Sequence, residues 1–513
     1  MNRLVRQILC TSLLLSASAA IAQTTLPPAL PSAPPPARAT QPPIAVALDL
    51  PVAPQPQLPS AAVTASLAAM PPRQLGHGVA TPVSTGQPLK LSLDDAVRLG
   101  LERNLTVVAD RQNERQIRGL QLTASNALAP SLTATAQTET QQINLAAMGF
   151  KAGTLGTLLP PGFTIKTIVK VDTTSAQLNL SQQLFNLPAF EIYRAAKATV
   201  DQSKLQTLLD RGSTVQTIAT QYLRILADTA TIHNAESQLV RDQALEYEAQ
   251  ARKDAGVGTN LDYLRARVQR QNREQQLIAS NAAFQKDKIQ LNRAMGLAAD
   301  QPIELTDAVP YHEIETLPLD KAKQVADKRR TDLLSLRAQL RSAELQRRAI
   351  AYERLPAATL GGYYGVLGET HGLYHGNFVV QGGINFPIFE EARIRGDRVV
   401  ADAQLSRLRS QIRSLQADIE QQLRSSMLDL TTASELVKDA TSNVDLATEA
   451  LDESQLRYRA GVEDNLPVVR AQATLAEAQA ELVSSLFQFN RAKLQLARNT
   501  GVIESQYDSY LGD

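Results

Sequence analysis

The stretch that decides the fold is AGVGTNLDYLRA at residues 255–266, because it returns as AGVEDNLPVVRA at residues 460–471. Seven of the twelve positions are identical, and the offset of 205 residues continues without a gap to Gly296 and Gly501. Such a period means that one structural unit is used twice. We therefore expect two repeats, at residues 89–296 and 319–503, with a linker at 297–318 and a C-terminal tail at 504–513.

Each copy of this motif carries the signals of a tight turn between two helices. Gly256 and Gly461 suit the left-handed residue that ends a helix, and Asn260 and Asn465 suit the N-cap of the next helix. Pro467 falls in the first turn of that next helix, where a missing N–H does no harm. The motif therefore predicts a helical tip at which the chain reverses.

The spacing of apolar residues on either side of the tips predicts long paired helices. Residues such as Leu205, Leu208 and Val215 recur at steps of three and four or seven, which is typical of coiled-coil seams. At 1.5 Å per residue, helices of this length span about 100 Å, a reach that suits a conduit better than a globular domain. The expected long helices are 188–254 and 390–459, and the expected return helices are 261–295 and 466–499.

Alternating residues earlier in each repeat predict two amphipathic hairpins. Leu132, Ala134 and Ala136, for example, alternate with Thr and Gln, so that one face is apolar and the other polar. Each hairpin follows a helical segment, at 92–128 or 319–353, and the first carries the longer loop, Gln142–Thr164. The expected strands are about 131–141 and 166–185 in the first repeat, and about 357–369 and 377–388 in the second.

The N-terminus predicts export from the cytoplasm. Arg3 and Arg6 precede a short apolar segment, and Ala20-Ile21-Ala22 fits a cleavage site, so residues 1–22 are expected to be a signal peptide rather than a membrane anchor. The only cysteine, Cys10, lies within it. Residues 23–88 are rich in Pro and Ala, which is typical of a disordered tether.

Charge and hydropathy limit the classes of function. The chain has 52 Lys and Arg against 51 Asp and Glu, a balance that gives no reason to expect nucleic acid as a partner. After the signal segment, no run of about 18 apolar residues predicts a transmembrane helix. The fold class expected from these patterns is mainly α, with a duplicated helix–hairpin–long helix–return helix unit and a membrane β-barrel portion.

Four amphipathic strands per chain predict an oligomer. In lipid every backbone N–H and C=O needs a partner, so an open four-stranded sheet is excluded. Two copies give eight strands, a barrel that its own side chains fill. Three copies give twelve strands and room for a lumen, and four or more copies remain open alternatives.

At this point the chain resembles a known family, the TolC-like outer-membrane factors of tripartite efflux and type I secretion systems. The resemblance covers residues 89–503 and rests on LSLDDAV at 91–97, the junctions Leu184-Phe185 and Ile388-Phe389, and the two tip motifs. It implies a homotrimer in the outer membrane of a Gram-negative bacterium, with a twelve-stranded β-barrel and a twelve-helix α-barrel tunnel that extends into the periplasm.

The resemblance also implies partners and functional residues at the tips. The tips are expected to dock a periplasmic adaptor (membrane fusion) protein attached to an inner-membrane pump of the RND, ABC or MFS type. The docking residues would be Gly256, Val257, Asn260, Leu261, Gly461, Val462, Asn465 and Leu466.

Some members of this family have a gate of charged and tyrosyl residues just inside the tip. Asp262 and Tyr458 match two positions of that gate, whereas Pro467 and Arg470 stand where it has carboxylates. Arg265 and Arg470 then either pair with Asp262 or are solvated. The candidate periplasmic gate is Asp262, Arg265, Tyr458 and Arg470.

We expect a passive channel with no cofactor, since no catalytic motif is present. His371 and His375 are four residues apart in a loop and lack a third ligand, so a surface role is expected over a metal site. The alternatives are a periplasmic coiled-coil adaptor, a structural spacer of the envelope and an envelope enzyme. The duplicated tips and hairpins argue against the adaptor and the spacer.

Overall fold

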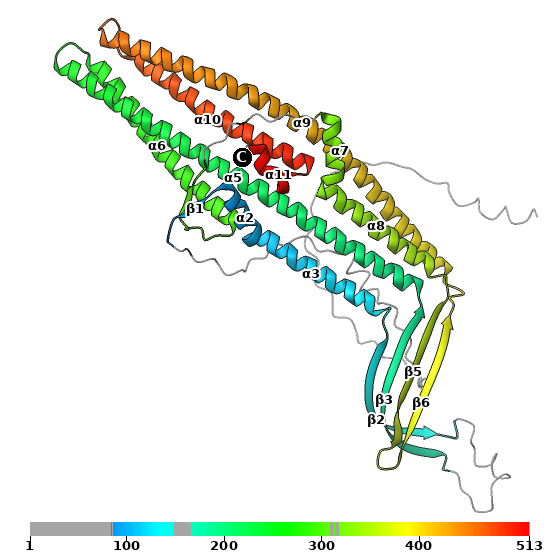
Figure 1. Ribbon diagram of the computed structural model, residues 1–513. Coiled ribbons are helices and arrows are strands. Elements are labelled where there is room, and N and C mark those ends of the chain that lie inside the picture. The colour runs from blue at the N-terminus through cyan, green and yellow to red at the C-terminus, as the bar shows by residue number, and fades with distance from the viewer. Residues whose placement is uncertain (1–83, 85, 148–165, 308–311, 313–317, 512–513) are drawn as a thin grey trace, which may run out of the picture. The chain divides into compact units, whose positions relative to one another are not determined.

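The computed structural model describes residues 84, 86–147, 166–307, 312 and 318–511 (Figure 1). The expected signal peptide, nearly all of the expected tether and most of the loop Gln142–Thr164 lie outside these ranges. Within them, the two repeats have the same order of elements. The first consists of α2 (Leu93–Arg103), α3 (Leu105–Asn126), β2 (Ser131–Asn144), β3 (Ile168–Phe185), α5 (Leu187–Asp254) and α6 (Asn260–Met295). The second consists of α7 (Leu319–Arg329), α8 (Thr331–Tyr352), β5 (Ala357–Glu369), β6 (Tyr374–Asn385), α9 (Glu391–Arg459) and α10 (Leu466–Thr500).

The long helices have nearly equal lengths, 68 residues in α5 and 69 in α9. Asn186 caps α5, because its side chain accepts a hydrogen bond from Ala189 N at 2.9 Å, and Pro188 occupies the first turn. α5 ends at Asp254 and α9 ends at Arg459. The bounds of the long helices and the return helices lie within one residue of the expected ones. Among the strands, β2 ends three residues later than expected, β3 begins two residues later, and β6 begins and ends three residues earlier.

The opening helix of each repeat is broken, although 92–128 and 319–353 were each expected to be one helical segment. In the first repeat the break is at Asn104, whose side chain accepts from Thr106 N at 2.9 Å and donates to Ala294 O at 2.8 Å. In the second it is at Arg330, which pairs with Asp332 at 2.6 Å. Because Ala294 is distant in sequence, the helical pattern alone did not reveal the break.

Two short elements correct the expected linker and tail. Residues Ile303–Leu305 of the linker form β4, which pairs in parallel with β1 (Leu89–Leu91). The tail residues 504–511 continue a helix, α11 (Ile503–Leu511), whose two end residues are buried. Both elements belong to the main apolar cluster around α5, which includes Tyr222 and Ile218.

The hairpins form one antiparallel sheet in the order β2-β3-β5-β6. Its register aligns the apolar positions of all four strands across one face. One row of neighbours is Ala134, Leu178, Tyr364 and Phe378, and the next is Leu132, Leu180, Gly362 and Val380. The other face is mainly polar, with rows such as Thr135, Gln177, Gly365 and Asn377, although Tyr363, Val379 and Leu367 also lie on it. The apolar face is exposed in the single chain, with Tyr364 71 % and Phe378 72 % accessible.

The helices continue the order of the strands. Next to the sheet, α5 packs between α3 and α8, and α8 packs on α9. Towards the tips, α5 packs between α6 and α10, and α10 packs on α9. As Figure 1 shows, α6 and α9 therefore lie at opposite edges of the tip-side helices. One edge of the chain consists of β2, α3 and α6, and the other consists of β6 and α9.

Candidate functional site

Both tips turn on a left-handed glycine, as predicted. Gly256 and Gly461 each have a φ of 73°. Their amides donate to the last turn of the preceding helix, from Gly256 N to Lys253 O and from Gly461 N to Tyr458 O, both at 3.0 Å. This geometry satisfies helix-terminal carbonyls with few residues, and it leaves the next residue of each tip exposed.

The prediction that Asn260 and Asn465 cap the return helices is wrong for their side chains. The N-cap of α6 is Thr259, which forms a capping box with Asp262: Asp262 N donates to Thr259 Oγ1 at 3.1 Å and Thr259 N donates to Asp262 Oδ2 at 3.3 Å. Asn465 occupies the N-cap position of α10 without a capping hydrogen bond from its side chain. The sequence held a signal for the first cap, since Thr-x-x-Asp resembles a capping box.

Asn465 instead joins the two tips. Its side chain is fully buried, and Nδ2 donates to Asp262 O at 2.8 Å. A second bond crosses beside it, from Arg265 Nη1 to Asp464 Oδ2 at 3.2 Å. The two copies of the motif therefore make different contacts. Asn260 is exposed, whereas Asn465 is hydrogen-bonded to the first tip.

The structure brings together three of the four candidate gate residues. Arg265 lies 3.7 Å from Asp262 on the same helix. Tyr458 is buried, and the Arg252 guanidinium stacks over its ring at 4.2 Å. Burial raises the pKa of the Tyr458 phenol, Arg252 opposes that shift, and Glu248 and Asp262 add to it. Arg470, by contrast, is exposed on α10 and forms no ion pair with any residue that the structure describes.

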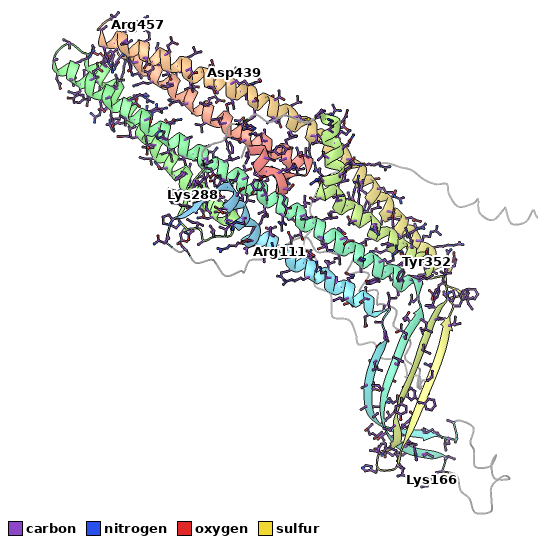
Figure 2. All side chains as sticks on the ribbon, in the orientation of Figure 1. Arg111, Lys166, Lys288, Tyr352, Asp439 and Arg457 are labelled. Carbon is purple, nitrogen blue, oxygen red and sulfur yellow. The ribbon has the colours of Figure 1, made fainter. Side chains whose placement is uncertain are left out.

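Sequence reasoning missed two residues of this cluster, Asp464 and Arg252. Both act across the gap between the tips, and Arg252 Nη2 also donates to Arg459 O at 3.4 Å. Figure 2 shows Arg457 near the end of α9 at the second tip, where it pairs with Glu453 at 2.9 Å and Glu463 at 3.5 Å. The Arg457–Glu453 pair follows the i,i+4 spacing of a helix. The contacts of Asp464 and Arg252 have no local signal, because their partners lie about 200 residues away in the chain.

The predicted docking residues differ in accessibility. Val257 and Val462, directly after the glycines, are 78 % and 74 % exposed, and Leu261 is 55 % exposed. Leu466 is half-buried and Asn465 is buried. The accessible surface of the tips therefore includes apolar residues from both repeats, next to exposed polar residues such as Asn260 and Asp464.

Among the described residues, no three His, Cys, Asp or Glu side chains are placed to hold a metal ion, and both His371 and His375 are exposed. In the part of the chain that the structure describes, no helix is both long enough and apolar enough to cross a membrane.

Comparison with known proteins decides the family. The model of the outer membrane efflux protein family matches residues 96–297 and 323–502, which are the two repeats. The chain belongs to this family. It is the outer-membrane channel component of an efflux system, and membership implies a trimeric channel that works with export machinery.

Individual relatives agree with this assignment. The chain is 24 % identical over 343 residues to the pyoverdine export outer membrane protein OpmQ of Pseudomonas putida, covering 64 % of this chain and 68 % of that one. The CmeC outer membrane channel of Campylobacter jejuni has the same fold, with a TM-score of 0.68 at 12 % identity over 84 % of this chain and 94 % of that one. The open MtrE outer membrane channel of Neisseria gonorrhoeae matches with a TM-score of 0.67 at 17 % identity over 81 % and 89 % of the two chains.

Proposed function

We propose that three copies of this efflux protein close their sheets into one twelve-stranded barrel, continued by a tunnel of twelve helices. The observation that carries the proposal is the register of the sheet, which leaves a continuous apolar face on one side and polar rows on the other. Strands β2 and β6 are the two sheet edges, and in lipid their free backbone groups need partners. Neighbouring copies supply those partners, with apolar faces toward lipid and polar faces toward the lumen.

The conduit is passive in this proposal and has no chemistry of its own. Energy and selectivity come from an inner-membrane pump of the RND, ABC or MFS type, linked to the channel by a periplasmic adaptor. The tips are the docking site for that adaptor, because the exposed apolar residues Val257, Val462 and Leu261 need a partner surface. Asn465 and the two glycines shape the tips from within, and Asn260 and Leu466 flank the contact.

The tip contacts also suit a gate. The ion pair of Arg265 with Asp464 and the hydrogen bond from Asn465 to Asp262 O hold the two coils of one copy together at the tunnel end. Separating the coils requires that both bonds break. Tyr458 and Arg252 pack behind them, while Arg470 lies outside this set and serves as a control position.

Two measurements test the proposal. Extracted with detergent from outer membranes, the protein should have the native mass of three copies; a monomer that needs no detergent contradicts the channel.

In planar bilayers, Arg265→Ala combined with Asp464→Ala should raise conductance over that of the unmodified channel, and Arg470→Ala should not. Equal conductance of all three proteins would refute the gate and leave the channel standing.

A further inference from the structure

A cavity of about 290 Å³ lies between the two coils of one chain, close to the tips. Its walls are formed by α5 of the first coil and by α9 and α10 of the second, with α10 between the other two helices (Figure 1). At its tip end the cavity reaches Tyr458, the buried tyrosine of the candidate gate. Its volume is close to the lower end of the range of small-molecule sites, about 300–1,000 Å³.

The floor of the cavity is apolar. Leu245 of α5, Leu451 of α9, and Val468 and Leu475 of α10 line it, and all four are buried in one cluster that joins the coils. A molecule in the cavity would cover this floor from water, which favours binding of an aliphatic or aromatic group.

A polar side chain without a partner belongs to the same floor. Gln472 lines the cavity and is only 5 % exposed, and its Oε1 atom is buried without a hydrogen bond from any residue that the structure describes. Gln238, which also faces α10, differs in this respect, because its Nε2 atom donates to Gln479 Oε1 at 2.8 Å. A buried acceptor without a donor destabilises the fold. A ligand N–H or O–H group in the cavity would supply that donor.

An unpaired guanidinium lies further along the wall. Arg241 of α5 is half-buried and lines the cavity, and its Nη2 atom is buried without a hydrogen-bond partner. The next residue in the chain, Asp242, pairs instead with Arg273 at 3.4 Å. Guanidinium groups bind carboxylates through short, charge-assisted hydrogen bonds. Arg241 therefore favours a negatively charged ligand.

These two polar groups are spaced along the cavity. The bond between Gln238 and Gln479 places those two residues at the same level of the antiparallel helices α5 and α10. Arg241 is three residues closer to the tip than Gln238, and Gln472 is seven residues closer than Gln479. The backbone levels of Arg241 and Gln472 therefore differ by about 6 Å, four residues at 1.5 Å each. From Arg241 towards Tyr458, the cavity presents a cation, then an amide oxygen, then an apolar floor.

The acidic residues of the wall leave Arg241 available. Glu248 of α5 pairs with Arg252 at 3.2 Å, and it is seven residues, about 10 Å, closer to the tip than Arg241. Asp452 of α9 is exposed. Arg459, at the tip end, adds a second positive charge to the wall. No carboxylate that lines the cavity pairs with Arg241, so its counter-ion has to come from outside the chain.

We propose that this cavity binds a small organic carboxylate that carries an N–H or O–H group and an aliphatic or aromatic body. The carboxylate binds Arg241, the N–H or O–H group donates to Gln472 Oε1, and the body covers Leu451 and Val468. Because Arg241 belongs to the first coil and Gln472 to the second, the bound molecule holds the coils together and keeps the gate closed. This effect rests on the proposed gate, whereas binding itself does not.

Equilibrium dialysis of the complete channel in lipid nanodiscs tests the site, with N-(2-naphthoyl)glycine as the probe. This molecule has a carboxylate, an amide N–H and an aromatic body, and N-(2-naphthoyl)glycinamide is its uncharged counterpart. The probe should bind once per chain. Replacing it by the glycinamide, or Arg241 by Gln, should each raise Kd roughly tenfold or more, because the charge-assisted bond is lost. Arg470→Gln is the matched control, since it removes an exposed arginine near Gln472 on α10 and should leave Kd unchanged.

Ala244→Trp provides a second test that keeps both polar groups. Ala244 lines the cavity and is exposed on α5, so an indole at this position would fill the cavity without displacing a buried side chain. The variant should remain trimeric and lose binding of the probe. Binding by Arg241→Gln or by Ala244→Trp as tight as that of the unmodified channel would overturn the site.

Planar bilayers test the effect on the gate. The probe should lower the conductance of the unmodified channel and leave the conductance of Arg241→Gln unchanged. Binding in dialysis with no change in conductance would overturn the link between the site and the gate. A protein that forms no channel would instead remove the proposed function, and the dialysis experiment would still decide whether the site binds the probe.

Discussion

The first coil (α5 with α6) and the second coil (α9 with α10) have helices of nearly equal length and similar tips. They differ in the residues between the paired helices, which are charged in the first coil and apolar in the second. At three levels the first coil places charged groups between its helices: Asp242 with Arg273 at 3.4 Å, Glu246 with Arg270 at 2.5 Å, and Asp228 and Asp287 bridged by Arg224 at 3.3 and 3.5 Å. At the positions 205 residues later, the second coil has Ala447 with Ala478, Leu451 with Leu475, and Ala433 with Ala492, all in its apolar clusters.

The difference shows that one backbone plan tolerates two ways of holding helices together. In the second coil the helices are held by buried volume, so loss of a side chain leaves a cavity. In the first, each charge depends on its partner, because a buried charge without its counter-ion is costly. The same geometry should therefore respond differently to equivalent substitutions.

The largest effect is expected from Arg273→Ala, which leaves the Asp242 carboxylate, 2 % exposed, without its partner. Removing one member of a buried pair costs about 3–5 kcal/mol, read out as a lower melting temperature by circular dichroism of the extracted protein. Asp242→Ala added to it copies Ala447 and Ala478 of the second coil, and should recover the loss or improve on it. A double variant as unstable as the single one would contradict the dependence of one charge on the other.

One level closer to the tip, a substitution in the second coil should lower stability more than the equivalent substitution in the first coil. Leu475 is buried, and Leu475→Ala should cost about 2–5 kcal/mol through lost burial and a cavity. Arg270→Ala, at the equivalent position of the first coil, should lower the melting temperature less, because solvent reaches the Arg270 and Glu246 side chains. Equal decreases in melting temperature for both variants would show that the contacts between paired helices stabilise the two coils in the same way at this level.

A shared feature of the repeats should respond equally. Gly296 and Gly501 end the return helices with a φ of 73° and 79°, and an added Cβ would lie 2.6 Å from Arg103 O and 2.8 Å from Arg330 N, respectively. Gly296→Ala and Gly501→Ala should therefore each lower the free energy of unfolding by more than the cost of a left-handed backbone alone, which is about 1–2 kcal/mol. Gly256→Ala is the matched control, since its φ is also 73° but nothing lies within 4 Å of the added atom. Melting temperatures that fail to separate the control from the other two would count against the close packing.

The smallest expected effect is a pH dependence of the first coil. Burial, followed by a hydrogen bond that protonated Asp228 donates to the Asp287 carboxylate, raises the pKa of Asp228 to about 6, with Arg224 opposing the shift. A raised carboxyl pKa means that the folded state binds more protons than the unfolded state between the two pKa values, so stability falls as pH rises through about 6. The melting temperature should drop between pH 5 and pH 7, and Asp228→Ala with Asp287→Ala, which copies Ala433 and Ala492, should reduce the drop. An unchanged pH profile in that variant would exclude this carboxyl pair as the cause.

The sequence by itself determined the duplication, the long helices, the left-handed glycines at Gly256 and Gly461, and the alternation of the strands. These features depend on periods of two, three and a half, and 205 residues, and on the backbone freedom of glycine, all of which are visible in the order of residues. The docking and gate residues were placed near the tips by resemblance, and their roles remain predictions.

Only the tertiary structure decided which of those residues meet. The breaks at Asn104 and Arg330, the pairing of β1 with β4, the buried end of α11 and the bond from Asn465 to Asp262 all depend on partners that are far apart in the chain. Asn260 and Asn465 occupy the same position of one motif, yet one is exposed and the other is buried against the neighbouring tip. Local patterns specify a helix or a turn, but a side chain's partner is fixed by packing between segments, which no local pattern encodes.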